Sequence, residues 1–445
     1  MTKTLKNLSI TQTIVMGYSL VITLGAILLW LPVSSASGDW TAFIDALFTA
    51  TSATAVTGQV TLNTATHWNY FGKTVIISLI EIGGLGFMTI WIIFYYYIFK
   101  QRPNLKQRRI VSEALSLDAG QNIQHKVWSI VRFALIVQLF GALLLTFEFV
   151  PEYGVTKGLY FSFFHSISAF CNAGFDLIGN SLIDYQNNPY VLFVIAGLIM
   201  SGGLGFIVWE DILNYRKTRN ISKYSKIVLT ATISLWILGT LLFWATEGPN
   251  GTFSHLSAGE QFANYLFLSV TPRTAGFANV DYANLSLSST FLTILFMFIG
   301  ASSGSTGGGI KVTTLAVIII VIYRSINYKN SSILNRTISF DTIRRAFFIF
   351  SSGIIIASVA TFILLNTENI PAGFGIEYIL VEVFSCLGTV GLTMGLTPSL
   401  TIIGKIILIL LMLIGRVGVM TFLWSLTAQK RESGIHYPEI SLLIG

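Results

Sequence analysis

The chain has 445 residues, of which 53% are hydrophobic and only 11% are charged, and its mean hydropathy is +0.71. A soluble protein is about 25% charged because it must solvate its surface. This composition therefore excludes a soluble enzyme, a disordered scaffold and a nucleic-acid-binding protein, in spite of a net charge of +7. Two cysteines cannot form a disulfide framework. The sequence predicts a polytopic, all-α membrane protein.

Eight apolar segments are long enough to cross the hydrocarbon core, which takes about 20 residues of helix. These predicted spans are Ile14–Leu31, Thr74–Phe99, Val127–Phe147, Pro189–Trp209, Ile227–Thr246, Phe291–Tyr323, Ala346–Thr367 and Thr401–Thr427. The N-terminal residues Met1–Thr11 carry two lysines and lack a small-residue cleavage site. We therefore expect no removable signal peptide.

The distribution of Lys and Arg predicts the orientation. The two tails and the segments 100–126, 216–226 and 324–345 hold 20 of the 27 basic residues. Every second connection is basic, and positively charged loops remain on the cytoplasmic side. Both termini are therefore expected in the cytoplasm, with the chain in the cell membrane.

The four outer connections each contain an apolar stretch of about 12 residues, which is too short to span a membrane. We interpret these stretches as half-depth, re-entrant helices: Trp40–Ser52, Lys157–Phe170, Glu260–Thr271 and Gly375–Leu387. Non-helical backbone at membrane depth is tolerated only where protein buries it or where it lines a watery cavity. Four such loops in one chain indicate a pore.

A short motif ending in glycine follows each half-helix. The glycines Gly58, Gly174, Gly276 and Gly391 are 116, 102 and 115 residues apart. The chain is thus predicted to be four copies of span, half-helix, loop and span around one central pore. The expected units are residues 12–100, 126–212, 226–324 (with a broken second helix) and 344–428, followed by a cytoplasmic tail, 429–445.

These glycines suit a site that strips water from a cation. Backbone carbonyls must replace the hydration shell, and glycine adopts the necessary positive φ without steric cost. The half-helices direct their negative C-terminal ends at the same site. The alternative is that these glycines only allow close helix packing. The residues assigned to the filter are Thr54, Ala55, Val56, Thr57, Gly58, Cys171, Asn172, Ala173, Gly174, Arg273, Thr274, Ala275, Gly276, Gly388, Thr389, Val390 and Gly391.

The second spans share a local motif: GGLG at 83–86 and 202–205, and GRVG at 415–418. Arg416 therefore takes the place of Gly84 and Gly203. A guanidinium at membrane depth faces a cavity or a partner. Below a cation filter it would raise the barrier to the next ion, and we interpret Arg416 as this pore barrier. The alternative is a salt bridge to Glu81, and both roles are compatible.

Glycine and small polar residues interrupt the span Phe291–Tyr323. Five of the twelve residues 300–311 are glycine, and each costs a helix about 1 kcal/mol relative to alanine. We interpret this stretch as a flexible gate loop under the filter; a packing kink is the alternative. The gate residues are Gly300, Ala301, Ser302, Ser303, Gly304, Ser305, Thr306, Gly307, Gly308, Gly309 and Lys311.

The motifs TAVTG (54–58), FCNAGF (170–175), PRTAGF (272–277) and LGTVGLT (387–393) resemble those of the Trk/Ktr/HKT superfamily of potassium transporters. The compact length and short tails most resemble the KtrB-type membrane subunits of bacterial Ktr systems. In this superfamily a serine replaces a filter glycine in sodium-selective members, so four glycines imply a preference for potassium. The resemblance also implies a gating role for the glycine-rich loop and an arginine facing the pore at position 416.

The resemblance further implies a homodimer seated on a cytoplasmic, RCK-type (KtrA-like) ring of nucleotide-binding subunits. ATP or ADP would bind to that ring and not to this chain. The apolar C-terminal segment Gly434–Gly445 is a candidate interface. Membrane lipid surrounds the chain, and no nucleic acid is expected as a partner.

The expected function is potential-driven uptake of potassium through the central pore, with sodium dependence left open. The alternative is a less selective channel or symporter for sodium and potassium. No catalytic cluster lies in the spans, so neither an enzyme nor a covalent cofactor is expected. Four acidic residues on or near the half-helices attract cations to the outer mouth or serve as solvated anchors: Asp45, Glu260, Glu377 and Glu382.

Overall fold

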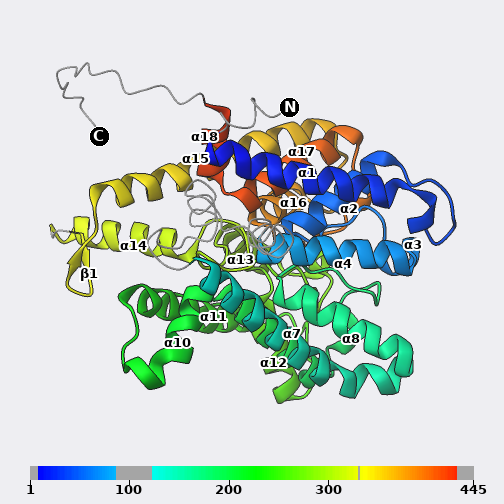
Figure 1. The fold of residues 1–445 in the computed structure, drawn as a ribbon, viewed down its shortest axis with the longest axis horizontal. Coiled ribbons are helices and arrows are strands. Elements are labelled where there is room, and N and C mark those ends of the chain that lie inside the picture. The colour runs from blue at the N-terminus through cyan, green and yellow to red at the C-terminus, as the bar shows by residue number, and fades with distance from the viewer. Residues whose placement is uncertain (1–8, 87–122, 329–330, 428–445) are drawn as a thin grey trace.

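The computed structural model describes residues 9–86, 123–328 and 331–427. In this part the chain is almost entirely helical (Figure 1), with one short hairpin of β1 (Ser332–Ile333) and β2 (Arg336–Thr337). Most of the basic segment 100–126, residues 87–99 of the second predicted span and the tail 429–445 lie outside the described residues.

Four long helices correspond to the first span of each predicted repeat: α1 (Ile10–Trp30), α7 (Ile123–Tyr153), α11 (Lys223–Glu247) and α15 (Phe340–Thr367). Each is long and apolar enough to cross a membrane. Serine residues cap three of them: Ser9, Ser222 and Ser339 each accept a hydrogen bond from a backbone N–H in the first turn, which satisfies a donor that the helix itself leaves open.

Four shorter helices correspond to the predicted half-helices: α2 (Phe43–Ala55), α8 (Val155–Phe170), α12 (Ala258–Val270) and α16 (Glu377–Gly388). Their ends lie within three residues of the predicted ones. Most of their residues are buried; in α2 these are Ala46 and every residue from Phe48 to Ala55. The architecture of span, re-entrant helix and span is therefore confirmed.

The second spans were predicted to be continuous in three repeats, and this is wrong wherever the whole span is described. The chain bends by 97° between α9 (Pro189–Gly203) and α10 (Phe206–Thr218), and by 107° between α17 (Ile402–Val417) and α18 (Val419–Leu426). In the first repeat, α4 (Tyr70–Leu85) ends in the same way at Gly86. The third repeat has the expected break, between α13 (Leu287–Phe298) and α14 (Val312–Ile326).

A glycine with positive φ lies at the end of α4 and at both bends. Gly86, Gly205 and Gly418 have φ of 85°, 91° and 94° and ψ of 125°, 143° and 134°. They occupy the last position of the repeated GGLG or GRVG motif. This region of conformational space is open essentially to glycine alone, so the motif ends the helix. Within the described residues, four unbroken helices could span a membrane, or six if each bent pair is one span.

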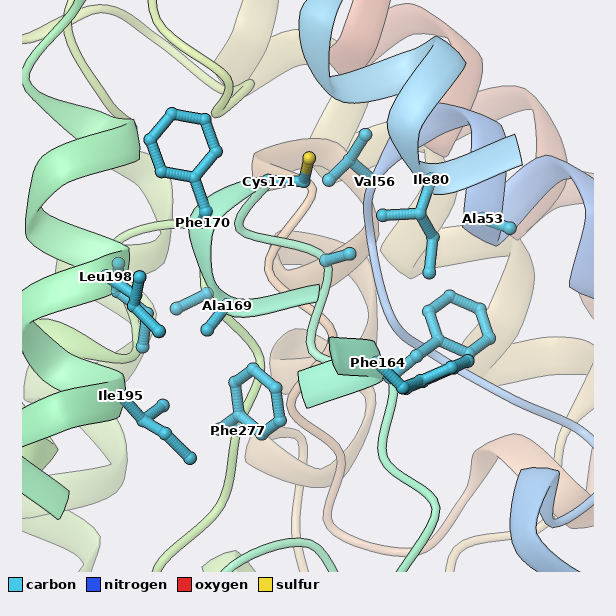
Figure 2. Close-up of a cluster of buried hydrophobic side chains, with 14 of the residues drawn as sticks. Ala53, Val56, Ile80, Phe164, Ala169, Phe170, Cys171, Ile195, Leu198 and Phe277 are labelled. Carbon is cyan, nitrogen blue, oxygen red and sulfur yellow. The ribbon is translucent and has the colours of Figure 1, made fainter. Parts of the chain in front are cut away.

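The remaining elements are single turns in the outer connections: η2 (Pro32–Ser34), α3 (Thr64–His67), η3 (Ile183–Tyr185), η4 (Tyr282–Asn284) and η5 (Thr397–Ser399). The first and last parts of the chain are neighbours, since α1 packs against α18 and α2 packs against α17; α1 and α17 lie side by side in Figure 1. Around the loops that follow the half-helices, buried side chains such as Phe164, Phe170 and Phe277 form the core (Figure 2).

Candidate ion pore

The structure brings the glycines Gly58, Gly174, Gly276 and Gly391 together in one closed ring, although they are spread over 333 residues of sequence. A methyl group built on Gly58 would lie 3.2 Å from the Cα of Gly174, and one on Gly174 would lie 2.8 Å from the Cα of Gly276. The same holds from Gly276 to Gly391 (3.3 Å) and from Gly391 back to Gly58 (3.0 Å). These four residues form the glycine ring.

Carbonyl oxygens lie in the same ring. For each ring glycine, the atom nearest to the built methyl group is a carbonyl oxygen. It belongs to the residue just before the next glycine of the ring: Ala173, Ala275, Val390 and Thr57, in this order. A side chain at any of the four positions would therefore collide with main chain. Only glycine allows the four loops to approach so closely.

The four loops share an unusual backbone conformation. The ring glycines have φ of 96°, 67°, 80° and 99°, and the residue two positions before each glycine also has positive φ: Val56 (58°), Asn172 (60°), Thr274 (76°) and Thr389 (52°). For β-branched residues such as Val56 and Thr389 this is a strained conformation that the surroundings must impose. Its presence in all four loops shows that the loops share one geometry.

Hydroxyl groups at the ends of the half-helices hold the loops. The Oγ atoms of Ser52 and Ser385 each accept a hydrogen bond, 3.0 Å long, from the N–H of Gly58 and Gly391. Ser168 donates to the carbonyl of Phe175 (2.8 Å), and Thr271 donates to that of Phe277 (2.5 Å). These contacts fix the loops without using the carbonyl oxygens of the ring.

Three further hydroxyl groups in the loops are buried without a hydrogen-bond partner, those of Thr54, Thr57 and Thr389. A buried hydroxyl group without a partner costs about 1–3 kcal/mol, so these three next to the glycine ring are available to a further ligand. Carbonyl and hydroxyl oxygens are the ligands of a dehydrated alkali cation. The half-helices α2, α8, α12 and α16 end immediately before this ring, and their C-terminal ends favour positive charge there. The residues present thus fit a monovalent cation.

Two residues assigned to the filter face away from the ring. The thiol of Cys171 donates to Glu81 Oε2 at 3.3 Å, behind the loop. The guanidinium of Arg273 is 5% exposed and lies over the ring of Trp236, 5.8 Å from its centroid. A guanidinium group inside the ring would repel any cation there. The structure instead places Arg273 against α11, where the aromatic face of Trp236 attracts it.

The predicted gate loop, residues 300–311, packs against the loops that carry the glycine ring. Methyl groups built on Gly307 and Gly308 would contact the hydroxyl groups of Thr274 and Thr389. The ends of the loop are tied together, since Gly300 N–H donates to the carbonyl of Ile310 at 2.8 Å. The end of α13 and the start of α14 therefore lie close together, and the glycines of the loop between them pack against the ring.

Neighbouring repeats anchor this loop. Ser302 and Thr306 donate their N–H groups to the carbonyls of Gly203 (3.1 Å) and Gly202 (3.2 Å). The N–H of Phe206, just past the bend at Gly205, donates to the carbonyl of Gly304 at 2.9 Å. The bend between α9 and α10 thus supplies the backbone donors and acceptors that hold the gate loop.

Arg416 lies beside the gate loop and not against Glu81. It donates to the carbonyls of Thr306 and Gly83, and to that of Gly84 at 3.2 Å. The alternative of an Arg416–Glu81 salt bridge is wrong, because Glu81 instead accepts from Gln138 at 2.9 Å and from Cys171. Arg416, on α17, therefore links the end of α4 to the gate loop.

A cavity of about 320 Å³ lies beside the gate loop. Arg416 and Lys311 both line it, together with glycines of the loop and with Gly86 and Gly418. Lys311 donates to the carbonyl of Gly307 at 2.8 Å. Two basic side chains therefore line the same cavity next to the loop.

The four acidic residues considered for the outer mouth have structural partners. Asp45 forms an ion pair with Lys405 (2.6 Å), and Glu260 caps its own helix through Ser257. Glu377 accepts from Gly375 N–H at 2.6 Å. Glu382 is 0% exposed, so it is neither a solvated anchor nor a residue of the open mouth. The carboxylate of each of these four residues therefore accepts a hydrogen bond from a residue of the protein.

Two residues that position the pore were not predicted from the sequence. Gln59, directly after Gly58, binds Glu382, and Tyr224 on α11 donates to the gate-loop carbonyl of Ser303 at 3.1 Å. A polar residue next to a filter glycine was an available signal for Gln59. Nothing in the sequence around Tyr224 indicated its contact, which joins residues 79 positions apart.

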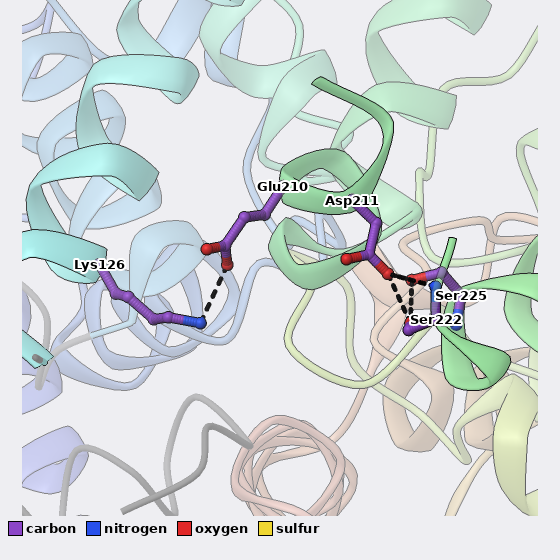
Figure 3. A network of polar contacts seen from close by, with 5 residues as sticks. All are labelled: Lys126, Glu210, Asp211, Ser222 and Ser225. Atoms are coloured by element: carbon purple, nitrogen blue, oxygen red, sulfur yellow. Dashed lines mark hydrogen bonds and ion pairs between the residues drawn. The ribbon is translucent and has the colours of Figure 1, made fainter. Parts of the chain in front are cut away.

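The helical hairpin of α10 and α11, which carries Tyr224, is held by a polar network (Figure 3). Lys126 pairs with Glu210 at 3.0 Å, and Asp211 accepts from the hydroxyl groups of Ser222 and Ser225 (2.5 and 2.6 Å). Burial alone would raise the pKa of Asp211, but the hydrogen bonds from the two serines outweigh it and lower the pKa. The carboxylate of Asp211 therefore stabilises the turn that leads to Tyr224.

Comparison with known proteins agrees with this geometry. Residues 5–434 match the family model TrkH, described as a cation transport protein. The chain is 47% identical to the potassium/sodium uptake protein NtpJ of Enterococcus hirae, over 99% of this chain and 98% of that one. It is 40% identical to the Ktr system potassium uptake protein B of Bacillus subtilis, over 98% and 96% of the two chains. The crystal structure of the potassium transporter TrkH from Vibrio parahaemolyticus has the same fold, with a TM-score of 0.70 at 19% identity over 93% of this chain and 83% of that one.

Proposed function

Because the chain belongs to the TrkH family of cation transport proteins, we propose that it takes up potassium ions through a selective central pore. The closed ring of Gly58, Gly174, Gly276 and Gly391, with the carbonyl oxygens between them, is the observation that supports this proposal. In this proposal potassium is the substrate, bound by main-chain oxygens that replace its water. Two relatives named as potassium uptake proteins are 40% and 39% identical to this chain over 98% of its length.

The membrane potential drives the ion inward in this proposal. A potential contributes about 2.3 kcal/mol per 100 mV for each unit charge, which corresponds to about fifty-fold accumulation. Transport then needs no hydrolysis by this chain. The excess of basic residues in alternate connections supports cytoplasmic termini and an inward path from the half-helix side.

The glycine-rich loop 300–311 is the proposed gate, and Arg416 is the proposed barrier at its side. The loop packs under Thr274 and Thr389, so it must move before a hydrated ion can pass. We propose that a nucleotide-binding, RCK-type ring moves it in a homodimeric assembly. Relatives named as parts of a Ktr system support a second component.

A less selective sodium and potassium pathway is the second candidate, favoured by the name of the relative that is 47% identical, a potassium/sodium uptake protein. Expression in a host that lacks potassium uptake distinguishes the two. Rescue of growth at low potassium, with uptake little inhibited by a tenfold excess of sodium, supports selective uptake. Equal uptake of both ions supports the second candidate, and absence of uptake by a folded, membrane-inserted protein refutes both.

A further inference from the structure

Glu382 on α16 is completely buried beside the outer end of the filter loops. Its carboxylate is 0% exposed, and a buried carboxylate is tolerated only when hydrogen bonds replace its water. It accepts from Gln59 Nε2 at 2.6 Å, from Thr397 Oγ1 at 2.8 Å and from the hydroxyl group of Thr393. Three donors from two segments of the chain thus hold the carboxyl group of Glu382 in one place beside the filter loops.

The cluster joins two repeats that the chain itself does not connect. Glu382, Thr393 and Thr397 belong to the last repeat, whereas Gln59 follows Gly58 in the first. The amide of Gln59 is fully used: Nε2 also donates to the carbonyl of Leu392 at 3.2 Å, and Oε1 accepts from the thiol of Cys386 at 2.6 Å. Gln59 is therefore held on both sides by the last repeat, one residue away from the glycine ring.

The second repeat has a polar side chain at the half-helix position that corresponds to Glu382, and this side chain also binds the loop that follows. Glu382 lies nine residues before Gly391, and His165 lies nine residues before Gly174. The imidazole of His165 accepts from the N–H of Leu177, three residues after Gly174, at 3.3 Å. In the last repeat, the hydroxyl group of Thr393, two residues after Gly391, donates to Glu382. This half-helix position thus holds the descending part of the loop in two repeats.

The other two repeats have no such contact. Thr49 lies nine residues before Gly58 and is 0% exposed, but its hydroxyl group has no hydrogen-bond partner. Phe267, nine residues before Gly276, has no polar side-chain atom. At this half-helix position the first repeat therefore has no polar contact of its own, and Gln59, directly after its ring glycine, contacts Glu382 of the last repeat instead.

We propose that Glu382 is a positioning residue that determines ion specificity, because it sets the place of Gly58 in the ring through Gln59. This inference rests on the proposed uptake function. The ring discriminates between cations by the distance and number of its oxygens. When the contact is lost, the loop of the first repeat shifts relative to the other three, and sodium, which is smaller, competes better.

The test measures the concentration of sodium that halves potassium uptake by the full-length protein in the deficient host. Glu382→Gln places two amide groups against each other, and we expect this concentration to fall at least tenfold. Gln59→Leu leaves Glu382 with both threonine donors, and we expect a similar fall even if Glu382→Gln does not fold. The double variant Glu382→Gln with Gln59→Glu exchanges donor and acceptor, and should recover most of the lost preference.

Thr49→Val is the matched control, because it changes the same half-helix position where the hydroxyl group has no partner. It should leave the preference unchanged. A purely structural role of Glu382 would reduce the amount of protein and the uptake of both ions in proportion. That result, or an unchanged preference in folded Gln59→Leu, would overturn the inference while potassium uptake by the wild type still stands. Absence of uptake by the wild type would instead refute the proposed function and this inference together.

Discussion

The bend between α17 and α18 depends on the backbone of a single residue, Gly418. Its φ of 94° and ψ of 134° lie in a region that is open essentially to glycine. A methyl group built on Gly418 would meet no atom closer than Thr421 Oγ1, at 3.9 Å. Gly418→Ala therefore changes backbone preference without a steric clash, so its effect measures the preference alone.

The size of the effect follows from two terms. A non-glycine residue in this region costs about 1–3 kcal/mol, and alanine favours a continuous helix over glycine by about 1 kcal/mol. Together these terms shift the balance from bent to straight by about 2–4 kcal/mol, or about 30- to 800-fold. Packing of α18 on α1 opposes the change. Gly418→Ala should therefore straighten the helix, or lower the melting temperature if packing prevents this.

Spin labels on each side of the bend measure the outcome. Leu410 and Leu426 are 47% and 69% exposed and suit labelling as cysteines, since Cys171 and Cys386 are 0% exposed. A straight helix separates these positions by about 24 Å, whereas two arms of about 12 Å meeting at the observed bend separate them by about 14 Å. Gly197→Ala on α9 is the control, because a methyl group there meets no atom within 4 Å and φ is ordinary. An unchanged distance together with an unchanged melting temperature in Gly418→Ala would refute the reasoning.

Three other changes test different parts of the pore. Arg416→Gln removes the guanidinium charge beside Thr306, so potassium uptake should become faster with unchanged ion preference; slower uptake by a folded variant would contradict the barrier. Tyr224→Phe removes the hydrogen bond to the gate-loop carbonyl of Ser303, which is worth about 1 kcal/mol. Potassium uptake with the gate at rest should therefore rise about fivefold; equal rates in the variant and the wild type would contradict this. The pKa of Asp211 is lowered in the folded protein, so its contribution to stability is present above the ordinary value and is lost as pH falls through the lowered one. The melting temperature of Asp211→Asn should therefore differ from that of the wild type at neutral pH and converge with it in strong acid; a constant difference would contradict the assignment.

The half-helices and the ring glycines could be predicted because membrane physics restricts them. An apolar stretch of about 12 residues between two spans cannot cross the bilayer, so Val155–Phe170 and its three counterparts had to be re-entrant. Glycine after such a helix indicates positive φ. Length and residue type carry this information locally, without knowledge of tertiary contacts.

The bends and the polar clusters could not be predicted in the same way. Hydropathy measures whether a segment is apolar and says nothing about the sign of φ at Gly205 or Gly418, although the repeated motif marked both positions. The orientation of Arg273 toward Trp236 depends on a helix that lies 37 residues earlier. The contact of Gln59 with Glu382 joins residues 323 positions apart, and no local pattern carries such information.

The contacts between the first and last repeats explain why charged side chains occur so deep in an apolar chain. Other repeats also meet through polar contacts, as where Glu81 of the first repeat accepts from Gln138 of the second and Asn264 donates to the carbonyl of Gln186. Between the last repeat and the first, where the chain provides no connection, Lys405 pairs with Asp45 and Glu382 binds Gln59. The side chains of the ion pair are each only 13% exposed, and polar contacts are strong where the dielectric constant is low. Because Glu382 and Lys405 come late in the sequence, the ring of four loops can close only after the last repeat has reached its place beside the first.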